Sequence, residues 1–332
     1  MRRPTVFEQR QTEADRRISE LRTILSDQLA SLPESDDHPD LCIYATGSLA
    51  RKEATIHSDL DAFFLLSGAE KDKPLGRIRD VRILNAVLNA QEAVGFPDFS
   101  NDGAYLKFLY IDDLVNWIGH REDDYKNSFT ARILLLSEST HLYNPSRYLE
   151  FKNKIIDKYF QDFHDHSRNF RPIFLLNDIL RFWRTLCLNY ENARHWRQDD
   201  DEIRRAKGHL DNLKLKFSRL NICYSFICHL LHQGGCLSKD AVRRTSDLTP
   251  LERLSEIADA DSEAAEIIAT MKSEYEWFLG VTGVPKDSAL NWIAAPNARE
   301  HAFDRASKFV EATGRLVQLI AEKNGYLRYL IV

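Results

Sequence analysis

The chain has 332 residues, which is enough for two domains of ordinary size. Its formal net charge of −5 and pI of about 6.1 argue against a strong nonspecific nucleic-acid binder. We find no apolar run long enough to span a membrane and no apolar core of a secretory signal. Five cysteines without a Cys-x-x-Cys pair are typical of buried thiols in a reducing compartment, so we expect a cytoplasmic protein with no membrane partner.

The first part of the chain reads as a small mixed α/β unit behind a leading helix. Apolar residues at helical spacing predict helices over residues 5–32 and 76–93. Short apolar runs rich in β-forming residues predict strands over residues 41–46, 60–66 and 105–111.

The remainder is predicted to be helical. Short candidates cover residues 113–118 and 128–140, and longer helices are predicted over residues 146–163, 172–192, 207–233, 250–280 and 299–326. Asn144-Pro145 interrupts the pattern, so we expect a domain over residues 1–145 and an all-helical bundle over residues 146–332. The expected fold class is α+β, with a small mixed sheet in the first domain.

The informative stretch begins where the first predicted strand ends, at Thr46-Gly47-Ser48. Gly47 lets the chain turn without the steric penalty of a Cβ atom. Ser48 would then open a short helix, whose first N–H groups are free to meet a phosphate.

Asp59-Leu60-Asp61 opens the second predicted strand. Residues i and i+2 of a strand point to the same side, roughly 6.6 Å apart, so both carboxylates would face one cleft while Leu60 enters the core. Hard, anionic oxygen ligands suit Mg²⁺ beside a triphosphate. Paired aspartates before a strand are also common surface residues, and it is the combination with Gly47-Ser48 that favours a metal site.

Two segments carry a family resemblance, and they read Thr46-Gly47-Ser48-Leu49-Ala50-Arg51-Lys52-Glu53 and His57-Ser58-Asp59-Leu60-Asp61. They resemble the nucleotidyltransferase superfamily of DNA polymerase β, most closely the branch that includes the PII uridylyltransferases. That branch reads Gly-[Gly/Ser]-x-x-Arg-x-Glu and then Ser-Asp-x-Asp. The resemblance implies transfer of a nucleoside monophosphate from an NTP such as ATP, with Asp59 and Asp61 binding Mg²⁺, or Mn²⁺ as the alternative.

The resemblance also implies a third carboxylate that activates the acceptor hydroxyl. The third predicted strand holds no acid, and Lys107 is its only charged residue. We therefore expect the third catalytic carboxylate to be Asp102, within a Phe-Ser-Asn-Asp-Gly segment that is equally typical of a surface turn. Asp98 and Asp112 are the alternatives.

Arg51 follows Ser48 within about one helical turn, so it is a candidate nucleotide-binding residue that neutralises phosphate charge. An ordinary solvated helix face is the alternative. Arg181 lies in an apolar helix that also carries Asn177, Asp178 and Arg184. Either Asp178 pairs with Arg181 one turn away, or this polar face lines the nucleotide cleft, which we favour.

A basic cluster over residues 211–219 provides further candidates, Lys214, Lys216, Ser218 and Arg219. Superfamily members have a helix after the catalytic core that supplies Lys and Ser or Thr to the nucleotide, and this cluster resembles it. Lys214 and Ser218 share a face at i and i+4, so we expect both to bind the nucleotide. The alternative is a solvated basic face.

The acceptor of the transfer cannot be named from the sequence. A protein or small molecule is favoured, because the acidic pI weighs against a nucleic acid. The other hypotheses are a synthase of nucleotide second messengers, a tRNA-modifying defence or toxin enzyme, and an inactive nucleotide-binding or interaction module. The oligomeric state stays open.

Overall fold

The computed structural model describes residues 4–331 except 34–38, 73–76, 100–102, 104–105, 167–169 and 197–201. The chain divides into two compact units, Met1–Lys158 and Tyr159–Val332. The first holds a four-stranded sheet behind a leading helix, and the described part of the second is helical. The expected α+β fold class is confirmed.

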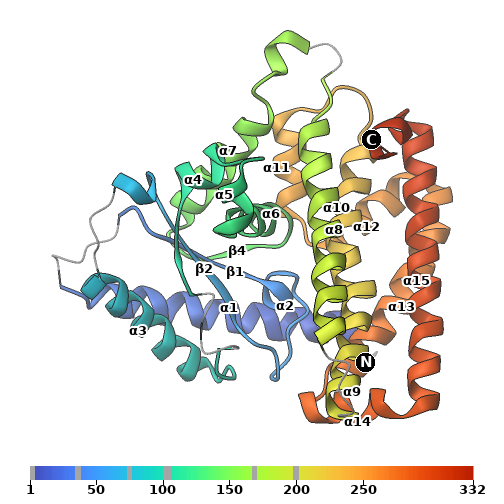
Figure 1. Cartoon of the computed structure of the whole chain (residues 1–332), viewed down its shortest axis with the longest axis horizontal. Helices are drawn as coiled ribbons and strands as arrows, with labels where there is room; N and C mark the ends of the chain where they lie inside the picture. Colours follow the sequence, from blue (N-terminus) through green and yellow to red (C-terminus); the bar gives the residue numbers. More distant parts are fainter. Residues whose placement is uncertain are drawn as a thin grey trace. The chain divides into compact units, whose positions relative to one another are not determined.

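The sheet is mixed, and its strands are β1 (Cys42–Thr46), β2 (Asp61–Leu66), β3 (Phe108–Tyr110) and β4 (Thr140–Tyr143). Their order is β3-β2-β1-β4 (Figure 1). β1 is antiparallel to both β2 and β4, whereas β3 runs parallel to β2. The N-terminal ends of β2 and β3 therefore lie at the same end of the sheet.

One face of the sheet packs on two helices, α1 (Val6–Ala30) and α3 (Arg77–Val94), which also pack on each other (Figure 1). Ile43 and Ala45 of β1 alternate with the residues of the other face and belong to one hydrophobic cluster with these helices. Phe64 joins the same cluster from β2. The sheet is thus anchored to the leading helix.

The opposite face is covered by the segment after β3. It contains α4 (Ile111–Asn116), α5 (Arg121–Tyr125), α6 (Ser128–Ser137) and α7 (Pro145–Tyr159). Tyr44 of β1 stacks on Phe63, with ring centroids 5.3 Å apart, and its hydroxyl donates to the carbonyl of Ala131 at 3.3 Å. Arg132 forms a fully buried, two-bond ion pair with Asp123 at 2.7 and 2.8 Å, which links α6 to α5.

The helix α7 belongs to the first unit, so the division falls after Lys158, later than the expected residue 145. The Tyr148 hydroxyl donates to the carbonyl of Ser139 at 3.1 Å. Arg147 pairs with Asp40 at 3.2 Å, on the segment that leads into β1. Asn144-Pro145 therefore ends a strand and starts a helix without separating two units.

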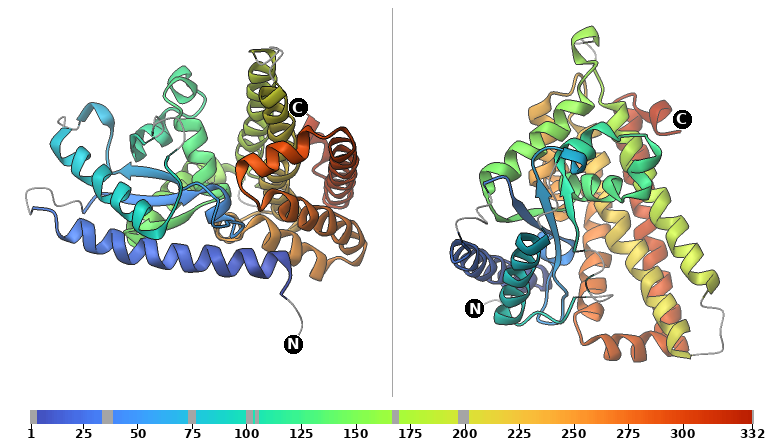
Figure 2. Two further views of the ribbon diagram at one scale, coloured as in Figure 1. Left: turned by 90° about the horizontal axis from the view of Figure 1, so that it is seen from below. Right: turned by 60° about the vertical axis from the view of Figure 1, so that its left-hand side comes forward.

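The second unit contains helices whose bounds are α8 (Ile173–Trp196), α9 (Glu202–Lys214), α10 (Leu220–His232), α11 (Lys239–Asp247), α12 (Pro250–Ala260), α13 (Ser262–Thr282), α14 (Lys286–Ala294), α15 (Pro296–Lys323) and α16 (Leu327–Ile331). A π-helical segment, Leu215–Arg219, joins α9 to α10. α13 and α15 lie side by side (Figures 1 and 2). Phe217 stacks on Phe278 at 4.7 Å between centroids within this helical core.

None of the helices that the structure describes is long and apolar enough to cross a bilayer.

Candidate active site

The turn after β1 is built around Gly47. Its φ is +69°, in the left-handed region that a residue with a Cβ atom rarely adopts. The short helix α2 (Gly47–Ala50) follows directly, as the sequence predicted. Within the described residues, the Ser48 hydroxyl forms no hydrogen bond to the protein, so it is available to a ligand.

The loop that returns from α2 is held by the leading helix α1. Arg10 donates to the carbonyl of Glu53 at 2.7 Å, and Arg17 donates to the carbonyl of Ile56 at 3.3 Å. The loop then turns at Ser58, whose hydroxyl accepts from the backbone N–H of Thr55 at 2.9 Å. The approach to the two aspartates is therefore fixed from α1 and from within the loop.

Asp59 and Asp61 are both exposed, whereas Leu60 between them is 3% exposed and belongs to the core. The strand register places Asp61 opposite Thr46, immediately before the glycine turn. The Oδ2 atom of Asp61 lies so close to Gly47 that a Cβ atom there would approach it well inside 3.0 Å. The sheet thus brings the Asp61 carboxylate to the turn that Ser48 follows.

Arg51 has a different environment from the one expected. It is only 8% exposed, and its Nε donates to Glu53 at 2.7 Å while Nη1 pairs with Glu138 at the end of α6. A guanidinium held by two buried carboxylates is committed to the protein and does not present a free charge to phosphate. The predicted nucleotide contact is replaced by a structural role that fixes the end of α2.

Glu138 is a partner of Arg51 that the sequence did not predict. It lies 87 positions after Arg51 in the chain, so no local pattern connects the two residues. The sequence did contain the Arg51-x-Glu53 spacing. In the structure these two residues form one of the two ion pairs of this buried group.

The sequence offered three candidates for the third carboxylate, which were Asp102, Asp98 and Asp112. Asp102 lies outside the described residues. Among the residues that the structure describes, no three His, Cys, Asp or Glu side chains converge as a metal-binding group. Asp98 is exposed in the coil after α3.

The sheet topology argues against the alternative Asp112. Because β2 and β3 are parallel, the segment before Phe108 lies at the Asp61 end of the sheet, and residues after Tyr110 lie at the opposite end. Asp112 follows Tyr110, and its carboxylate pairs with Lys154 of α7. It therefore does not lie beside Asp61.

The remaining predicted residues belong to the second unit. Arg181 pairs with Asp178 at 3.3 Å, which is the i, i+3 pair that one of the two alternatives foresaw. Asp178 also accepts a hydrogen bond from the Tyr159 hydroxyl at 2.5 Å. The Arg181 side chain remains about one third exposed.

Lys214 and Ser218 do not share an exposed face. Lys214 is exposed at the end of α9, whereas Ser218 is 7% exposed and accepts a hydrogen bond from Tyr275 at 3.4 Å. The expectation assumed α-helical spacing, but residues 215–219 are π-helical and rotate the following side chains to other positions.

A mixed sheet in which a Gly-Ser turn meets two exposed aspartates agrees with the nucleotidyltransferase resemblance of the sequence motif. Residues 7–102 match the profile of a family described as putative nucleotidyltransferase DUF294. The match covers α1, β1, α2, β2 and α3, and it supports membership of this segment in the nucleotidyltransferase superfamily. A comparison with curated proteins found no significant match.

Proposed function

We propose that the protein is a Mg²⁺-dependent nucleotidyltransferase that moves a nucleoside monophosphate from an NTP to an acceptor, with a protein or small molecule favoured. The observation that carries this proposal is the position of Asp61, whose carboxylate lies against Gly47, the residue immediately before Ser48. Asp59 is exposed two residues earlier, on the opposite side of the chain from the buried Leu60.

The donor atoms suit the proposed metal. Asp59 and Asp61 supply exposed, hard carboxylate oxygens, and Mg²⁺ is bound in proteins by a few carboxylates together with substrate phosphates. Mn²⁺ accepts the same ligands. When bound, the ion would neutralise charge on the triphosphate and on the developing oxyanion.

The chain's own groups hold and orient the nucleotide. The free N–H groups at the start of α2 and the Ser48 hydroxyl are suited to phosphate oxygens. Gly47 keeps this surface open, because any side chain there would displace the Asp61 carboxylate. Lys214, exposed at the end of α9, and Arg181 stay candidates for further nucleotide contacts.

The reaction itself is a substitution at the α-phosphorus. The acceptor oxygen forms the new bond to phosphorus, the bond to the β-phosphate oxygen breaks, and pyrophosphate leaves with that electron pair. We assign the removal of the acceptor proton to Asp102, the carboxylate that the family resemblance and the sequence favour and that lies outside the described residues.

The test combines binding and turnover in the full-length protein. Each α-labelled NTP, beginning with ATP, is incubated with the protein, Mg²⁺ and a cell lysate, and labelled molecules are then separated by size and identified. We expect label on one class of acceptor, and we expect Asp59→Asn and Asp61→Asn to abolish it. Glu92→Gln, an exposed carboxylate on α3, is the matched control and keeps full activity.

The possible outcomes separate the hypotheses. Label in nucleotide-sized products without lysate would identify a second-messenger synthase, and label in tRNA would identify a nucleic-acid acceptor. NTP binding by calorimetry without any labelled product would favour an inactive nucleotide-binding module. Unchanged labelling in both aspartate variants would overturn the assignment of the site.

A further inference from the structure

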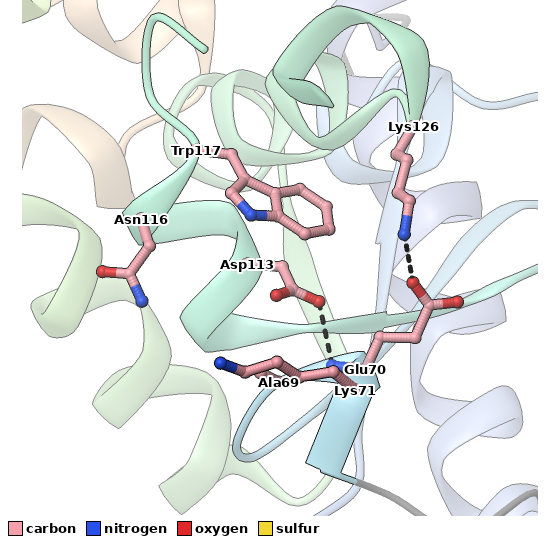
Figure 3. A pocket seen from close by; sticks show the side chains of 7 residues that line it. All are labelled: Ala69, Glu70, Lys71, Asp113, Asn116, Trp117 and Lys126. Atoms are coloured by element: carbon pink, nitrogen blue, oxygen red, sulfur yellow. Dashed lines mark hydrogen bonds and ion pairs between the residues drawn. The ribbon is translucent and has the colours of Figure 1, made fainter. Parts of the chain in front are cut away.

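A cavity lies in the first unit, and none of the residues that line it belongs to the candidate active site (Figure 3). Its volume of about 330 Å³ falls at the lower end of the range for small-molecule pockets. It is lined by Ala69, Glu70, Lys71, Asp113, Asn116, Trp117 and Lys126. Ala69 follows the C-terminal end of β2, and α4 follows β3, so the cavity lies at the end of the sheet opposite Asp61.

Two of the four charges around this cavity neutralise each other. Lys126 pairs with Glu70 at 2.5 Å, and its ammonium lies 4.8 Å from the centroid of the Trp117 ring. Figure 3 shows the Trp117 ring as the wall opposite the Glu70–Lys71 backbone. These contacts build the aromatic side of the cavity and leave no net charge there.

Asp113 is the unusual group. It is only 8% exposed, and one carboxylate oxygen, Oδ2, accepts the backbone N–H of Glu70 at 3.0 Å. Its other oxygen forms no hydrogen bond within the described part of the chain and points into the open side of the cavity (Figure 3). This oxygen is open to the cavity, so a ligand cation at this point would form a charge-assisted hydrogen bond with it.

The electrostatic environment of Asp113 agrees with this reading. Burial raises the pKa of its carboxyl above the ordinary value, whereas the hydrogen bond from the Glu70 backbone lowers it and the charge of the Glu70 carboxylate raises it. Lys126 acts in the opposite direction, although its ammonium is already paired with Glu70.

The complementary charge is on Lys71. Its side chain extends along the cavity below Asp113 and is exposed (Figure 3). Lys71 forms no ion pair with any residue that the structure describes, Asp113 included. The cavity therefore presents one carboxylate oxygen and one ammonium, unpaired and separated, beside an aromatic ring and the exposed Asn116 amide.

We propose that this cavity binds a free α-amino acid, with the ligand ammonium on Asp113, its carboxylate on Lys71 and its side chain against Trp117. A zwitterion is the simplest ligand that satisfies both charges at once. A simple anion would meet the Asp113 carboxylate, and a simple amine would leave Lys71 unpaired. The assignment is independent of the proposed transferase activity, because it uses none of the residues at the Gly47 turn.

Binding is measured by calorimetry on the full-length protein, after a thermal-shift screen of the individual proteinogenic L-amino acids. For the amino acid that binds, we compare the matching amine without the carboxylate and the matching acid without the amine. L-phenylalanine, phenethylamine and 3-phenylpropionate form one such set. We expect each truncated compound to bind at least about tenfold more weakly, since each loses one charge-assisted hydrogen bond.

Two variants locate the site. Asp113→Asn keeps the shape and the acceptor for the Glu70 N–H but removes the charge, and Lys71→Met removes the ammonium from an exposed position. Both should weaken binding about tenfold or more. Lys107→Met, another exposed lysine of the same unit outside the cavity, should bind as the wild type does.

The proposal fails if no amino acid binds at millimolar concentration, or if the amine or the acid alone binds as tightly as the amino acid. The comparison of the three compounds uses the wild-type protein, so it decides the question even where Asp113→Asn does not fold.

Discussion

The Asp61 carboxylate occupies the space that a side chain at Gly47 would need. The same glycine has a φ of +69°, so both its backbone conformation and its missing Cβ atom are required at this position. The pairing of β1 with β2 therefore places Asp61, a candidate metal ligand, against the turn at Gly47, which is a candidate phosphate-binding turn.

A comparison of Gly47→Ala with Gly95→Ala should separate the effect of the positive φ from the effect of the added Cβ atom. Gly95 has a similar φ of +78°, but a Cβ atom there meets nothing within 4 Å. Both variants should lose about 1–2 kcal/mol of unfolding free energy from backbone strain. Only Gly47→Ala should also lose nucleotidyl transfer, by about 100-fold or more, because Asp61 is displaced.

Chemical denaturation and the labelling assay measure the two effects. Equal residual activity in the two alanine variants, at equal stability, would show that the contact between Gly47 and Asp61 has no part in the reaction.

We expect Arg51 to stabilise the folded protein through its buried ion pairs. Arg51→Met would leave the buried carboxylates of Glu53 and Glu138 without this cation, so we expect a loss of about 3–5 kcal/mol in unfolding free energy. Arg16→Met is the matched control, because Arg16 pairs with Glu13 and Glu20 on the exposed face of α1. Exposed pairs contribute about 0–1 kcal/mol.

Urea denaturation compares the two arginine variants directly. A loss below about 1 kcal/mol for Arg51→Met would contradict the structural role and return Arg51 to the list of nucleotide contacts.

The sequence alone was sufficient to predict those helices and strands whose signal lies within the element itself. The two strands that carry the motif were predicted over residues 41–46 and 60–66, and β1 and β2 confirm them. The leading helix was predicted over residues 5–32 and extends over residues 6–30. These elements have strong periodic or continuous apolar patterns, and Leu60 was correctly assigned to the core.

The misses have physical causes that a single sequence does not display. β4 was not predicted. It is a four-residue strand at the edge of the sheet, and its sequence has no alternation of apolar and polar residues that would indicate a strand. The helix predicted over residues 250–280 is divided, since the Asp261 side chain caps α13 by accepting from the N–H groups of Glu263 and Ala264. The π-helical segment at residues 215–219 has no sequence signature that distinguishes it from an α-helix.

The placement of the candidate site residues depended on local signals in the same way. The positions of Gly47, Ser48, Asp59 and Asp61 follow from one motif and two strands. The roles of Arg51 and Ser218 depend on partners distant in the chain, Glu138 and Tyr275, which only the folded structure brings to them.

Acid should destabilise the first unit through His141. Burial, with a smaller contribution from Arg22, lowers the pKa of this histidine from 6.5 to about 4. Nδ1 of its ring lies 3.4 Å from Nη2 of Arg22, which donates to neutral imidazole and repels imidazolium. Because the folded pKa is below the unfolded one, the unfolded chain binds the proton first, and stability present above pH 6.5 is lost as the pH falls toward 4.

His141→Gln should reduce this loss, since glutamine does not titrate and the backbone carbonyl still accepts from Arg22 at 3.0 Å. Denaturant midpoints of wild type and variant between pH 7 and pH 4 give the measurement. Parallel curves for the two proteins would show that other groups cause the acid sensitivity.

Lys214 and Ser218 should respond differently to substitution, because the structure gives them different environments. Lys214→Met should raise the KM for the NTP about tenfold, if the exposed ammonium contacts phosphate, and should leave stability unchanged. Ser218→Ala removes the nearly buried acceptor of the Tyr275 hydroxyl, so it should cost about 1 kcal/mol of stability with little effect on KM. Lys286→Met, at an exposed position of α14, is the control for charge removal. An equal rise in KM in Lys214→Met and Lys286→Met would mean that the loss of any positive charge weakens NTP binding. A rise in KM confined to Ser218→Ala would assign the nucleotide contact to Ser218 in place of Lys214.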